Sequence, residues 1–190
     1  MLDKILQWDR DLFVFLNNLS DGRYDGFWIL VTNIATWIPL YVLFICLLFL
    51  KFPKKEAWYK FLTLLGMVIF VTTLTYLVKI SVERLRPNNT EEINQLIRIL
   101  HSPTDFSFFS GHASFSFSVA ILMVLFMKKK IKWALFFLIW PVLFASSRIF
   151  VGVHFPLDII VGALVGGVSG FLAYRIYGRF IAPGIGSARP

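Results

Sequence analysis

The chain has 190 residues, of which 57% are hydrophobic and 16% charged, a balance too apolar for an ordinary soluble domain of this size. Its net charge of +8 would suit a nucleic-acid partner, but the cations flank apolar segments as they do in membrane proteins, so we predict no nucleic-acid binding. The single cysteine, Cys46, excludes an intramolecular disulfide.

The first segment, residues 2–18, mixes apolar and charged residues at helical spacing. We interpret it as an amphipathic helix that lies in the membrane interface. A short first span is the alternative, and the run Asp9, Arg10 and Asp11 argues against it because charges are costly inside a bilayer. The same charges are too many for the apolar stretch of a cleavable signal peptide.

Five apolar segments follow, and a stretch of ~20 such residues can span a bilayer as a helix. We predict spans at about 26–50, 58–82, 111–127, 132–150 and 156–177, with a kink in the first at Pro39. Residues 83–109 form a polar connection in which a short surface helix would run from Thr90 through Leu100. The prediction is an all-α, polytopic membrane helical bundle with five transmembrane spans, an N-terminal interfacial helix and a single domain, 1–190.

Gly162, Gly166 and Gly170 recur every four residues in the last predicted span. Small residues at that spacing let two helices approach closely inside a lipid bilayer. A homodimer contact is one interpretation of this pattern, and packing within the bundle is the one that we favour. The oligomeric state is not predicted.

The basic residues give the predicted orientation in the membrane. Five spans place eleven Lys and Arg on one side and eight on the other, and short cytoplasmic loops are enriched in these residues. The side of the membrane with eleven Lys and Arg residues is therefore predicted to be cytoplasmic. The protein is expected to be a multi-pass protein of a bacterial cytoplasmic (inner) membrane.

Three clusters of polar residues lie at the ends of the apolar segments, and the predicted topology places all of them on the outward side. Ionisable groups at a membrane edge are costly and usually mark function. The clusters are Lys79 with Arg86-Pro87, then Ser110-Gly111-His112, then Ser147-Arg148 with His154 and Asp158.

These residue types suit the binding and cleavage of a phosphate ester. Three fixed cations stabilise phosphoryl oxygens, the two arginines bidentately and Lys79 as a point charge. The helix start at Ser110-Gly111-His112 adds unpaired N–H groups that favour an anion. One histidine can attack phosphorus while the other protonates the leaving oxygen. Asp158 follows His154 by four residues, so on a helix the carboxylate can hold the second nitrogen of the nucleophile.

Each of these residues also has a structural interpretation when it is taken alone. Lys79 can pair with Glu83, one helical turn further on, and Arg148 can form a structural bridge to Asp158. Taken together, in this order and on one side of the membrane, the residues favour a site over a set of unrelated contacts.

The remaining polar residues are interpreted without a catalytic role. Arg84 and Arg98 either attract anionic head groups or are simply solvated, and His101 is interpreted as a solvated loop residue. The spacing of the three histidines fits no zinc pattern. We therefore predict no metal and no cofactor.

The three clusters resemble the motifs of the type 2 phosphatidic acid phosphatase family, which includes the vanadium-dependent haloperoxidases. The first motif, Lys, six residues and Arg-Pro, is matched by Lys79 to Arg86-Pro87. The second, Pro-Ser-Gly-His, reads Phe109-Ser110-Gly111-His112, with Phe in a position that shapes the turn. The third, Ser-Arg, five residues, His, three residues and Asp, is matched by Ser147 to Asp158.

The resemblance implies a metal-independent phosphatase and assigns a role to each matching residue. It implies that His154 is the nucleophile and forms a phosphohistidine, that Asp158 orients it, and that His112 protonates the leaving group. It also implies a set of phosphate-binding residues: Lys79, Arg86, Ser110, Gly111, Ser147 and Arg148.

A lipid phosphate is the predicted substrate, because it could reach a site at the outward interface sideways from the outer leaflet. We favour undecaprenyl diphosphate, since recycling of this carrier on the outer face fits the topology. The alternatives are a lipid A phosphate, phosphatidylglycerol phosphate and phosphatidic acid. Five aromatics crowd the approach, as contacts for a lipid tail or as interfacial anchors: Phe106, Phe108, Phe109, Phe115 and Phe117.

Two other function classes fit the sequence less well. A haloperoxidase would use the same pocket for vanadate, and five spans disfavour it because those enzymes are typically soluble. A non-enzymatic transporter would need polar residues in the middle of the membrane, and the main ones are Thr72, Thr73 and Thr75. Phosphate release separates an enzyme from a transporter.

Overall fold

The structure is a computed structural model that describes residues 1–186, and this part of the chain is helical with no strand. Three helical stretches are long and apolar enough to cross a membrane, namely Ile34–Lys51, Lys54–Asn94 and Pro156–Ile181. Two shorter apolar helices, Gly111–Met127 and Ala134–Phe150, lie among them. The prediction of an all-α membrane helical bundle is confirmed.

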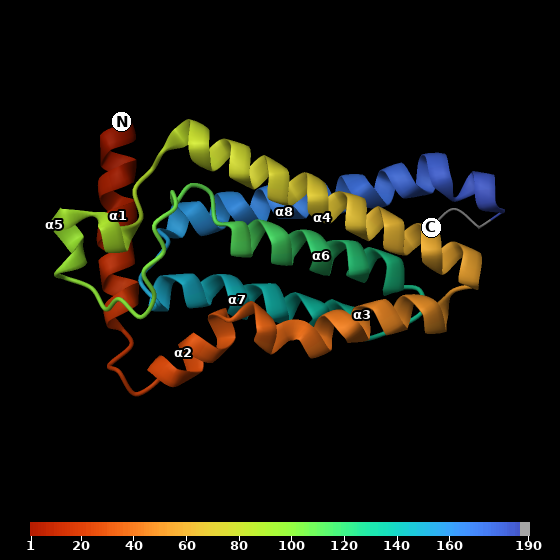
Figure 1. Cartoon of the computed structure of the whole chain (residues 1–190), viewed down its shortest axis with the longest axis horizontal. Coiled ribbons are helices and arrows are strands. Elements are labelled where there is room, and N and C mark those ends of the chain that lie inside the picture. Colours follow the sequence, from red (N-terminus) through yellow and green to blue (C-terminus); the bar gives the residue numbers. More distant parts are fainter. Residues whose placement is uncertain (187–190) are drawn as a thin grey trace.

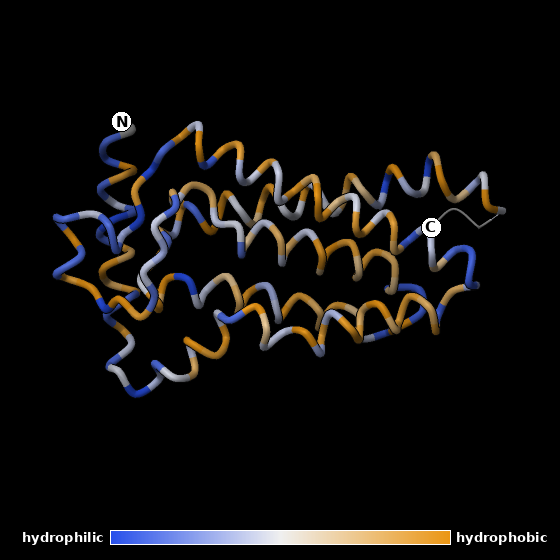
Figure 2. Tube along the Cα trace, viewed as in Figure 1, coloured by the Kyte–Doolittle hydropathy of each residue, from blue (hydrophilic) through white to orange (hydrophobic). Residues whose placement is uncertain are grey.

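The bundle helices run lengthwise, and α1 (Leu2–Asn18) lies across one end of them (Figure 1). Hydrophobic residues follow the lengthwise helices, and hydrophilic residues gather at the two ends (Figure 2). The lengthwise elements are α2 (Asp25–Thr32), α3 (Ile38–Lys51), α4 (Lys54–Val82), α6 (Gly111–Met127), α7 (Ile139–Phe150) and α8 (Pro156–Ile176).

The buried face of α1 consists of Asp9, Phe13 and Asn17, which are spaced four residues apart and therefore share one side of the helix. The Asn17 amide donates to the Ile149 carbonyl oxygen at 2.8 Å, and its oxygen accepts from the Arg98 backbone N–H at 2.7 Å. The opposite side of α1 exposes Trp8 and other apolar residues. Helix α1 is thus fixed to the end of the bundle through polar contacts.

The first apolar segment, predicted as one span over 26–50, is interrupted. It forms α2, a 3-10 turn and α3, and the break falls at Asn33, whose side chain accepts from a backbone N–H two residues on. Short polar side chains compete with the helix backbone in this way. The side chains of Thr36 and Trp37 donate to carbonyl oxygens at the end of α2. The predicted kink at Pro39 is wrong, since this residue lies in the first turn of α3, where a missing N–H costs nothing.

Two further segments differ from their predicted form. The span predicted over 132–150 begins as a 3-10 helix, Ala134–Leu138, and continues as α7. The surface helix predicted from Thr90 through Leu100 is reduced to α5, Glu91–Asn94, preceded by a 3-10 turn at Pro87–Asn89. The rest of the connection up to α6 is irregular and returns over the end of the bundle beside α1 (Figure 1).

The three glycines of α8 face α6 within the bundle, as predicted. A Cβ atom added to Gly162, Gly166 or Gly170 would come within 3.0 Å of a backbone carbonyl oxygen at or next to α6. Those oxygens belong to Ser110, Ser114 and Ser118, which share the same spacing. Helices α6 and α8 therefore lie in close backbone contact along their length.

Replacing Gly166 by alanine is expected to lower the stability of the purified protein by about 1–3 kcal/mol, because the added methyl group has no room against the Ser114 carbonyl. Thermal unfolding in detergent measures this. The matched control is Gly66→Ala on α4, where no atom of the described chain lies within 4 Å of an added Cβ. Equal melting temperatures for the two variants would contradict the close contact between α6 and α8.

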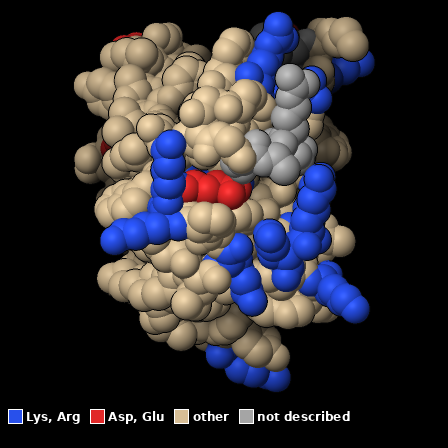
Figure 3. All heavy atoms as spheres, turned by 90° about the vertical axis from the view of Figure 1, so that its right-hand side faces the viewer, with Lys and Arg blue, Asp and Glu red and all other residues tan. Residues whose placement is uncertain are grey.

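Lysine and arginine side chains gather around the end of the bundle opposite α1 (Figure 3). These residues lie at the end of α3, at the start of α4 and in the segment after α6. The others lie at the end of α8 and in the π-helical turn Tyr177–Ile181. They are Lys51, Lys54, Lys55, Lys128, Lys129, Lys130, Lys132, Arg175 and Arg179. The bundle therefore has one strongly basic end.

Candidate active site

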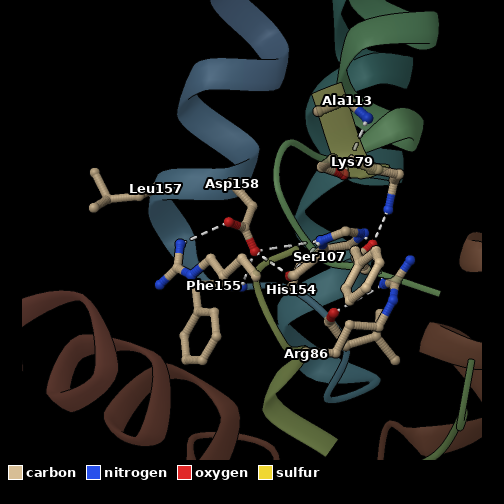
Figure 4. A network of polar contacts seen from close by, with 12 residues as sticks. Lys79, Arg86, Ser107, Ala113, His154, Phe155, Leu157 and Asp158 are labelled. Carbon is tan, nitrogen blue, oxygen red and sulfur yellow. Dashed lines mark hydrogen bonds and ion pairs between the residues drawn. The ribbon is translucent and has the colours of Figure 1, made fainter. Parts of the chain in front are cut away.

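The polar clusters singled out by the sequence meet at the α1 end of the bundle. Lys79 lies in the last turn of α4, His154 lies between α7 and α8, and Asp158 lies in the first turn of α8. Together with Arg86, which follows α4, they form one network of hydrogen bonds and ion pairs (Figure 4).

The His154 side chain is fully enclosed, and each ring nitrogen faces a different partner. Arg86 Nη1 lies 2.9 Å from His154 Nε2. A guanidinium can only donate, so Nε2 must accept and the ring proton must reside on Nδ1. Nδ1 lies 3.4 Å from Asp158 Oδ2. The geometry therefore fixes the tautomer with the Nε2 lone pair directed towards Arg86.

The surroundings of His154 keep its ring neutral. Burial lowers the pKa of His154 well below its usual value, and the positive charges of Arg86, Arg148 and Lys79 lower it further. A neutral imidazole at neutral pH has a free lone pair on the nitrogen that is not protonated. His154 therefore has the protonation state that a nucleophile requires.

Ser107, in the loop before α6, lies between the histidine and the aspartate, and its side chain is fully buried. Its Oγ donates to Asp158 Oδ2 at 2.5 Å and lies 3.2 Å from His154 Nδ1. The Phe155 backbone N–H donates to the same carboxylate oxygen at 3.0 Å. Ser107 was not predicted from the sequence, because it belongs to none of the motifs and nothing in its sequence neighbourhood distinguishes it.

The cations Lys79 and Arg86 form ion pairs with a carboxylate of the same chain, that of Asp105. Arg86 Nη2 donates to both carboxylate oxygens of Asp105, at 2.9 and 3.0 Å, and Lys79 Nζ donates to Oδ2 at 3.0 Å. Lys79 also donates to the Phe106 carbonyl oxygen. The alternative pairing of Lys79 with Glu83 is not the one that forms, since Lys79 turns towards the 101–109 loop.

The two cations favour the ionised form of Asp105. Partial burial raises its pKa, but the hydrogen bonds and charges of Arg86 and Lys79 outweigh burial and lower the pKa to about 2. Its carboxylate therefore supplies negatively charged oxygens at the position where the sequence predicts a phosphate. A phosphate that uses the same two cations has to displace it.

Replacing Asp105 by asparagine is expected to tighten the binding of inorganic phosphate or vanadate about tenfold, which corresponds to ~1.4 kcal/mol. The amide removes a competing negative charge from Lys79 and Arg86. Competitive inhibition of phosphate release measures the affinity, and the exposed Asp21→Asn serves as the control. Weaker anion binding in the Asp105 variant would mean that the carboxylate organises the cations instead of competing for them.

Arg148 in α7 is 4% exposed, and its guanidinium donates to the Thr32 hydroxyl of α2. Its Nε is buried and has no hydrogen-bond partner within residues 1–186. The group interacts electrostatically with His112, His154 and Arg86. The alternative of a structural bridge to Asp158 is not the arrangement that forms. Arg148 is left with a donor that an incoming anion can use.

Ser147 precedes Arg148 on α7 and is fully buried. Its hydroxyl donates to the Phe144 carbonyl oxygen at 2.7 Å, one turn back on the same helix. In this structure the Ser147 hydroxyl is therefore occupied by its own helix.

The start of α6 carries the second cluster. The Ser110 hydroxyl accepts from the Ala113 backbone N–H at 3.4 Å and caps the helix, and the Ser110 N–H donates to the Asp158 carbonyl oxygen at 2.9 Å. The N–H groups of Gly111 and His112 lie in the first turn, where a helix offers no backbone acceptor. The His112 ring packs against Phe144 with centroids 4.7 Å apart. The cluster thus presents its donors at the same end as His154.

The comparisons with known proteins agree with this arrangement. A family model described as the PAP2 superfamily matches residues 60–182, which contain all three clusters. The chain belongs to the PAP2 superfamily. This is the family that the motifs resemble, and the chain is a membrane phosphatase of this family.

Two relatives and one solved structure locate the chain within the PAP2 family. It is 29% identical to a lipid A 4'-phosphatase of Bacteroides thetaiotaomicron, over 96% of this chain and 82% of that one. It is 31% identical to an undecaprenyl-diphosphatase of Sulfolobus acidocaldarius, over 87% and 77%. A PAP2-type phosphatidylglycerolphosphate phosphatase from Bacillus subtilis shares its fold, with a TM-score of 0.75 at 20% identity over 93% and 88% of the two chains.

A cleft of about 430 Å³ reaches the site of this PAP2 phosphatase from the side of the bundle. Helix α4 lines it with Thr72, Thr75, Tyr76 and Lys79, and the other lining residues are Ile34, Gly111, His112, Phe115 and Phe144. The cleft thus lies between α4 and the break in the first apolar segment. Its inner end contains a predicted cation and the histidine predicted to act as the acid.

Of the five aromatics expected near the approach, Phe115 lines this cleft. Phe108 lines a separate cavity of about 580 Å³ beside α1, and Phe109 is buried in the core. The five aromatics therefore do not all line this cleft. The loop that contains three of them folds over the end of the bundle and contacts the cleft-lining Lys79 through the Phe106 carbonyl oxygen.

The interpretation of Arg84 as a solvated or lipid-attracting residue is wrong. Arg84 Nη1 donates to Asp158 Oδ1 and Nη2 donates to Asp9 Oδ2, both at 2.7 Å. Arg98 is also paired, with Asp25 and the Ser20 carbonyl oxygen. No pattern in the sequence marks these pairs, because their partners lie more than seventy residues away.

Proposed function

We propose that this PAP2 phosphatase hydrolyses a lipid diphosphate at the outer face of a bacterial cytoplasmic membrane, with undecaprenyl diphosphate as the substrate. The observation that carries the chemistry is the neutral His154, whose Nε2 contacts Arg86, one of the two cations that already hold the Asp105 carboxylate. A phosphoryl group in place of the Asp105 carboxylate would lie beside the lone pair that attacks it.

The nucleophilic step follows from the His154 geometry. Nε2 attacks phosphorus and forms a phosphohistidine while the bond to the leaving oxygen breaks. The imidazole then bears a positive charge, and the Nδ1 proton remains in place between Ser107 and Asp158. The Asp158 carboxylate stabilises that charge without taking the proton.

The phosphoryl oxygens would be held by the predicted phosphate-binding residues. Lys79, Arg86 and Arg148 supply three positive charges in a largely buried setting, where they stabilise the charge that develops in transfer. The first N–H groups of α6, at Gly111 and at His112, add donors, and the hydroxyls of Ser110 and Ser147 complete the set after rotating away from their helix contacts.

His112 is the proposed acid. It lies at the inner end of the cleft, so a lipid in the cleft presents its leaving oxygen to this ring. His112 donates a proton to that oxygen and then accepts one from the water that hydrolyses the phosphohistidine. Each turnover therefore returns both histidines to their starting state.

The proposed mechanism assigns no role to a metal, because the three cations supply the charge that a metal ion supplies in other phosphoryl transfers. Phosphate release by the purified enzyme is expected to continue unchanged in excess chelator. A loss of turnover on chelation, restored by added metal, would contradict this part of the mechanism.

The outward orientation is supported by the basic end of the bundle (Figure 3). Lys and Arg favour the cytoplasmic side of a membrane. The site lies at the other end, beside α1. Cysteine labelling in whole cells with a reagent that does not cross the membrane tests this orientation. A cysteine that replaces the exposed His101 is expected to be labelled, and one that replaces the exposed Lys129 is not.

The cleft supports a polyprenyl substrate. Its exposed lining is almost wholly apolar, which suits an isoprenoid chain. Lys79 lies both in the cleft and in the cation pair, so it could contact the second phosphate of a diphosphate as well as the first. A relative named as an undecaprenyl-diphosphatase agrees with this choice.

A lipid A 4'-phosphate is the second candidate substrate, because a relative of that name aligns with 96% of the chain. The leaving group of this substrate is a hydroxyl group of a sugar, and the molecule bears several acyl chains. The cleft would have to widen between α4 and the 3-10 turn Ile34–Trp37 to admit it.

A panel of four lipids tests the substrate: undecaprenyl diphosphate, lipid A, phosphatidylglycerol phosphate and phosphatidic acid, each in detergent micelles. The expected result is that undecaprenyl diphosphate has the highest kcat/KM. A preference for lipid A would transfer the assignment to the second candidate. Release from none of the four would contradict the proposed function as a whole.

A further inference from the structure

The Asp158 carboxylate is fully buried, and a negative charge in that position requires a partner. Its Oδ2 accepts hydrogen bonds from the Ser107 hydroxyl, the Phe155 backbone N–H and His154 Nδ1–H. Its Oδ1 has a different partner, Arg84 Nη1 at 2.7 Å, which is the cation that forms an ion pair with this carboxylate. The orientation of the carboxylate towards His154 therefore depends on Arg84.

Arg84 is itself held in place by α1. Its Nη2 donates to Asp9 Oδ2 at 2.7 Å, and the other Asp9 oxygen accepts from the Leu157 backbone N–H at 2.9 Å. The guanidinium lies over the Phe155 ring, 4.1 Å from its centroid. Phe13 of α1 packs edge-on against the same ring at 5.3 Å. Helix α1 therefore contacts the beginning of α8 through both a charge and an aromatic ring.

Asp9 has no other evident reason to be charged and buried. It is fully buried in a helix whose remaining charges are exposed or half-exposed. A buried carboxylate without a partner would be strongly destabilising, so its position is explained by Arg84 and Leu157. The two acids and the arginine form one chain of charges from α1 to the histidine.

We propose that Arg84 and Asp9 are positioning residues for the catalytic pair Asp158 and His154, and that α1 is a working part of the active site. The inference rests on the proposed function, because it concerns the same nucleophile. Arg84 fixes the rotamer and the charge of Asp158, and Asp9 fixes Arg84. Both residues act on the histidine side of the site, away from the Asp105 carboxylate that Lys79 and Arg86 hold.

The decisive variant is Arg84→Gln. It is expected to lower kcat for lipid phosphate hydrolysis about a hundredfold and to leave KM within about twofold, because only the histidine side of the site is disturbed. Arg84→Lys is expected to recover about tenfold in kcat, since the charge beside Asp158 returns but cannot bridge two carboxylates. Arg23→Gln, in an exposed pair with Asp21, is the control.

Asp9→Asn provides a second, milder variant. Arg84 and the Leu157 N–H donate to different oxygens of Asp9, and asparagine has an NH₂ group in place of one of them. One contact is therefore lost, and kcat is expected to fall about tenfold. Asp11→Asn, two residues further on the same helix and exposed, is expected to match the wild type. If Arg84→Gln does not fold, Arg84→Lys and Asp9→Asn decide the question.

A double-variant cycle separates positioning from a general loss of structure. In an Asp158→Asn background, Arg84→Gln is expected to cost less than twofold further, because the group through which Arg84 acts has already been removed. A full additional hundredfold loss, a wild-type kcat in Arg84→Gln, or a loss confined to KM would each overturn the inference. An inactive wild type would instead contradict the proposed function, so the two failures are distinguishable.

Discussion

Replacing His154 by alanine is expected to lower phosphate release by a factor of ~10⁴ or more, the loss that follows removal of a nucleophile. The ring is enclosed by protein, and its Nε2, beside Arg86, is the proposed nucleophilic nitrogen. Phosphate release from the best lipid of the panel measures the effect. The variant is also expected to trap no phosphohistidine after an alkaline quench with radiolabelled substrate.

The matched control for this prediction is His101→Ala, which removes an exposed histidine from the loop before α6. That variant is expected to retain wild-type turnover. A His154 variant that still releases phosphate at more than a few per cent of the wild-type rate, while remaining folded, would transfer the nucleophile to another residue.

Replacing Asp158 by asparagine is expected to lower kcat by ~10³–10⁴-fold through the wrong histidine tautomer. Arg84 is the charged donor to this side chain, so we expect it to keep the amide oxygen. The NH₂ group then faces His154 and replaces the oxygen that accepts from Ser107 and the Phe155 N–H. Nδ1 must then accept, and its proton moves to Nε2, which breaks the contact with Arg86 because a guanidinium and a protonated Nε2 both donate. The lone pair proposed to attack phosphorus is lost, although the size of the side chain is nearly unchanged.

Kinetics and a structural readout check this prediction together. The kcat value is expected to fall while inorganic phosphate still inhibits with an affinity close to that of the wild type, because Lys79 and Arg86 are untouched. Nitrogen NMR of the His154 ring would detect the proton on Nε2. An unchanged tautomer with full loss of activity would show that the position of the ring proton is not the cause of the loss.

The sequence predicted the helical layout because the length of an apolar segment is a local property. It failed inside the first segment, where the Asn33 side chain captures a backbone N–H and the helix breaks. It failed again over residues 90–100, where the side chains of Asn17 and Asn18 bind backbone groups that a longer helix would use for itself. Local hydropathy indicates where a chain can cross a membrane, and side-chain competition with the backbone decides where it bends.

The motif residues could be predicted because their spacing is recorded in the sequence itself. Their partners could not. Asp105 was missed because it lies in an irregular loop, and Ser107 because a serine in such a loop carries no pattern. Arg84 and Asp9 were missed because their pairing joins positions 75 residues apart, and an ion pair of that kind exists only after the chain has folded.

The interlocked glycines of α8 and carbonyls of α6 have a consequence for how this enzyme can diversify. The proposed acid and nucleophile stand at the beginnings of these two helices, and sliding one helix along the other would force backbone atoms into each other at every turn. The reacting groups thus keep a constant separation. The opposite wall, built by α4 and Ile34, is free of this constraint, so residue exchanges there can adapt the enzyme to a new lipid without disturbing its chemistry.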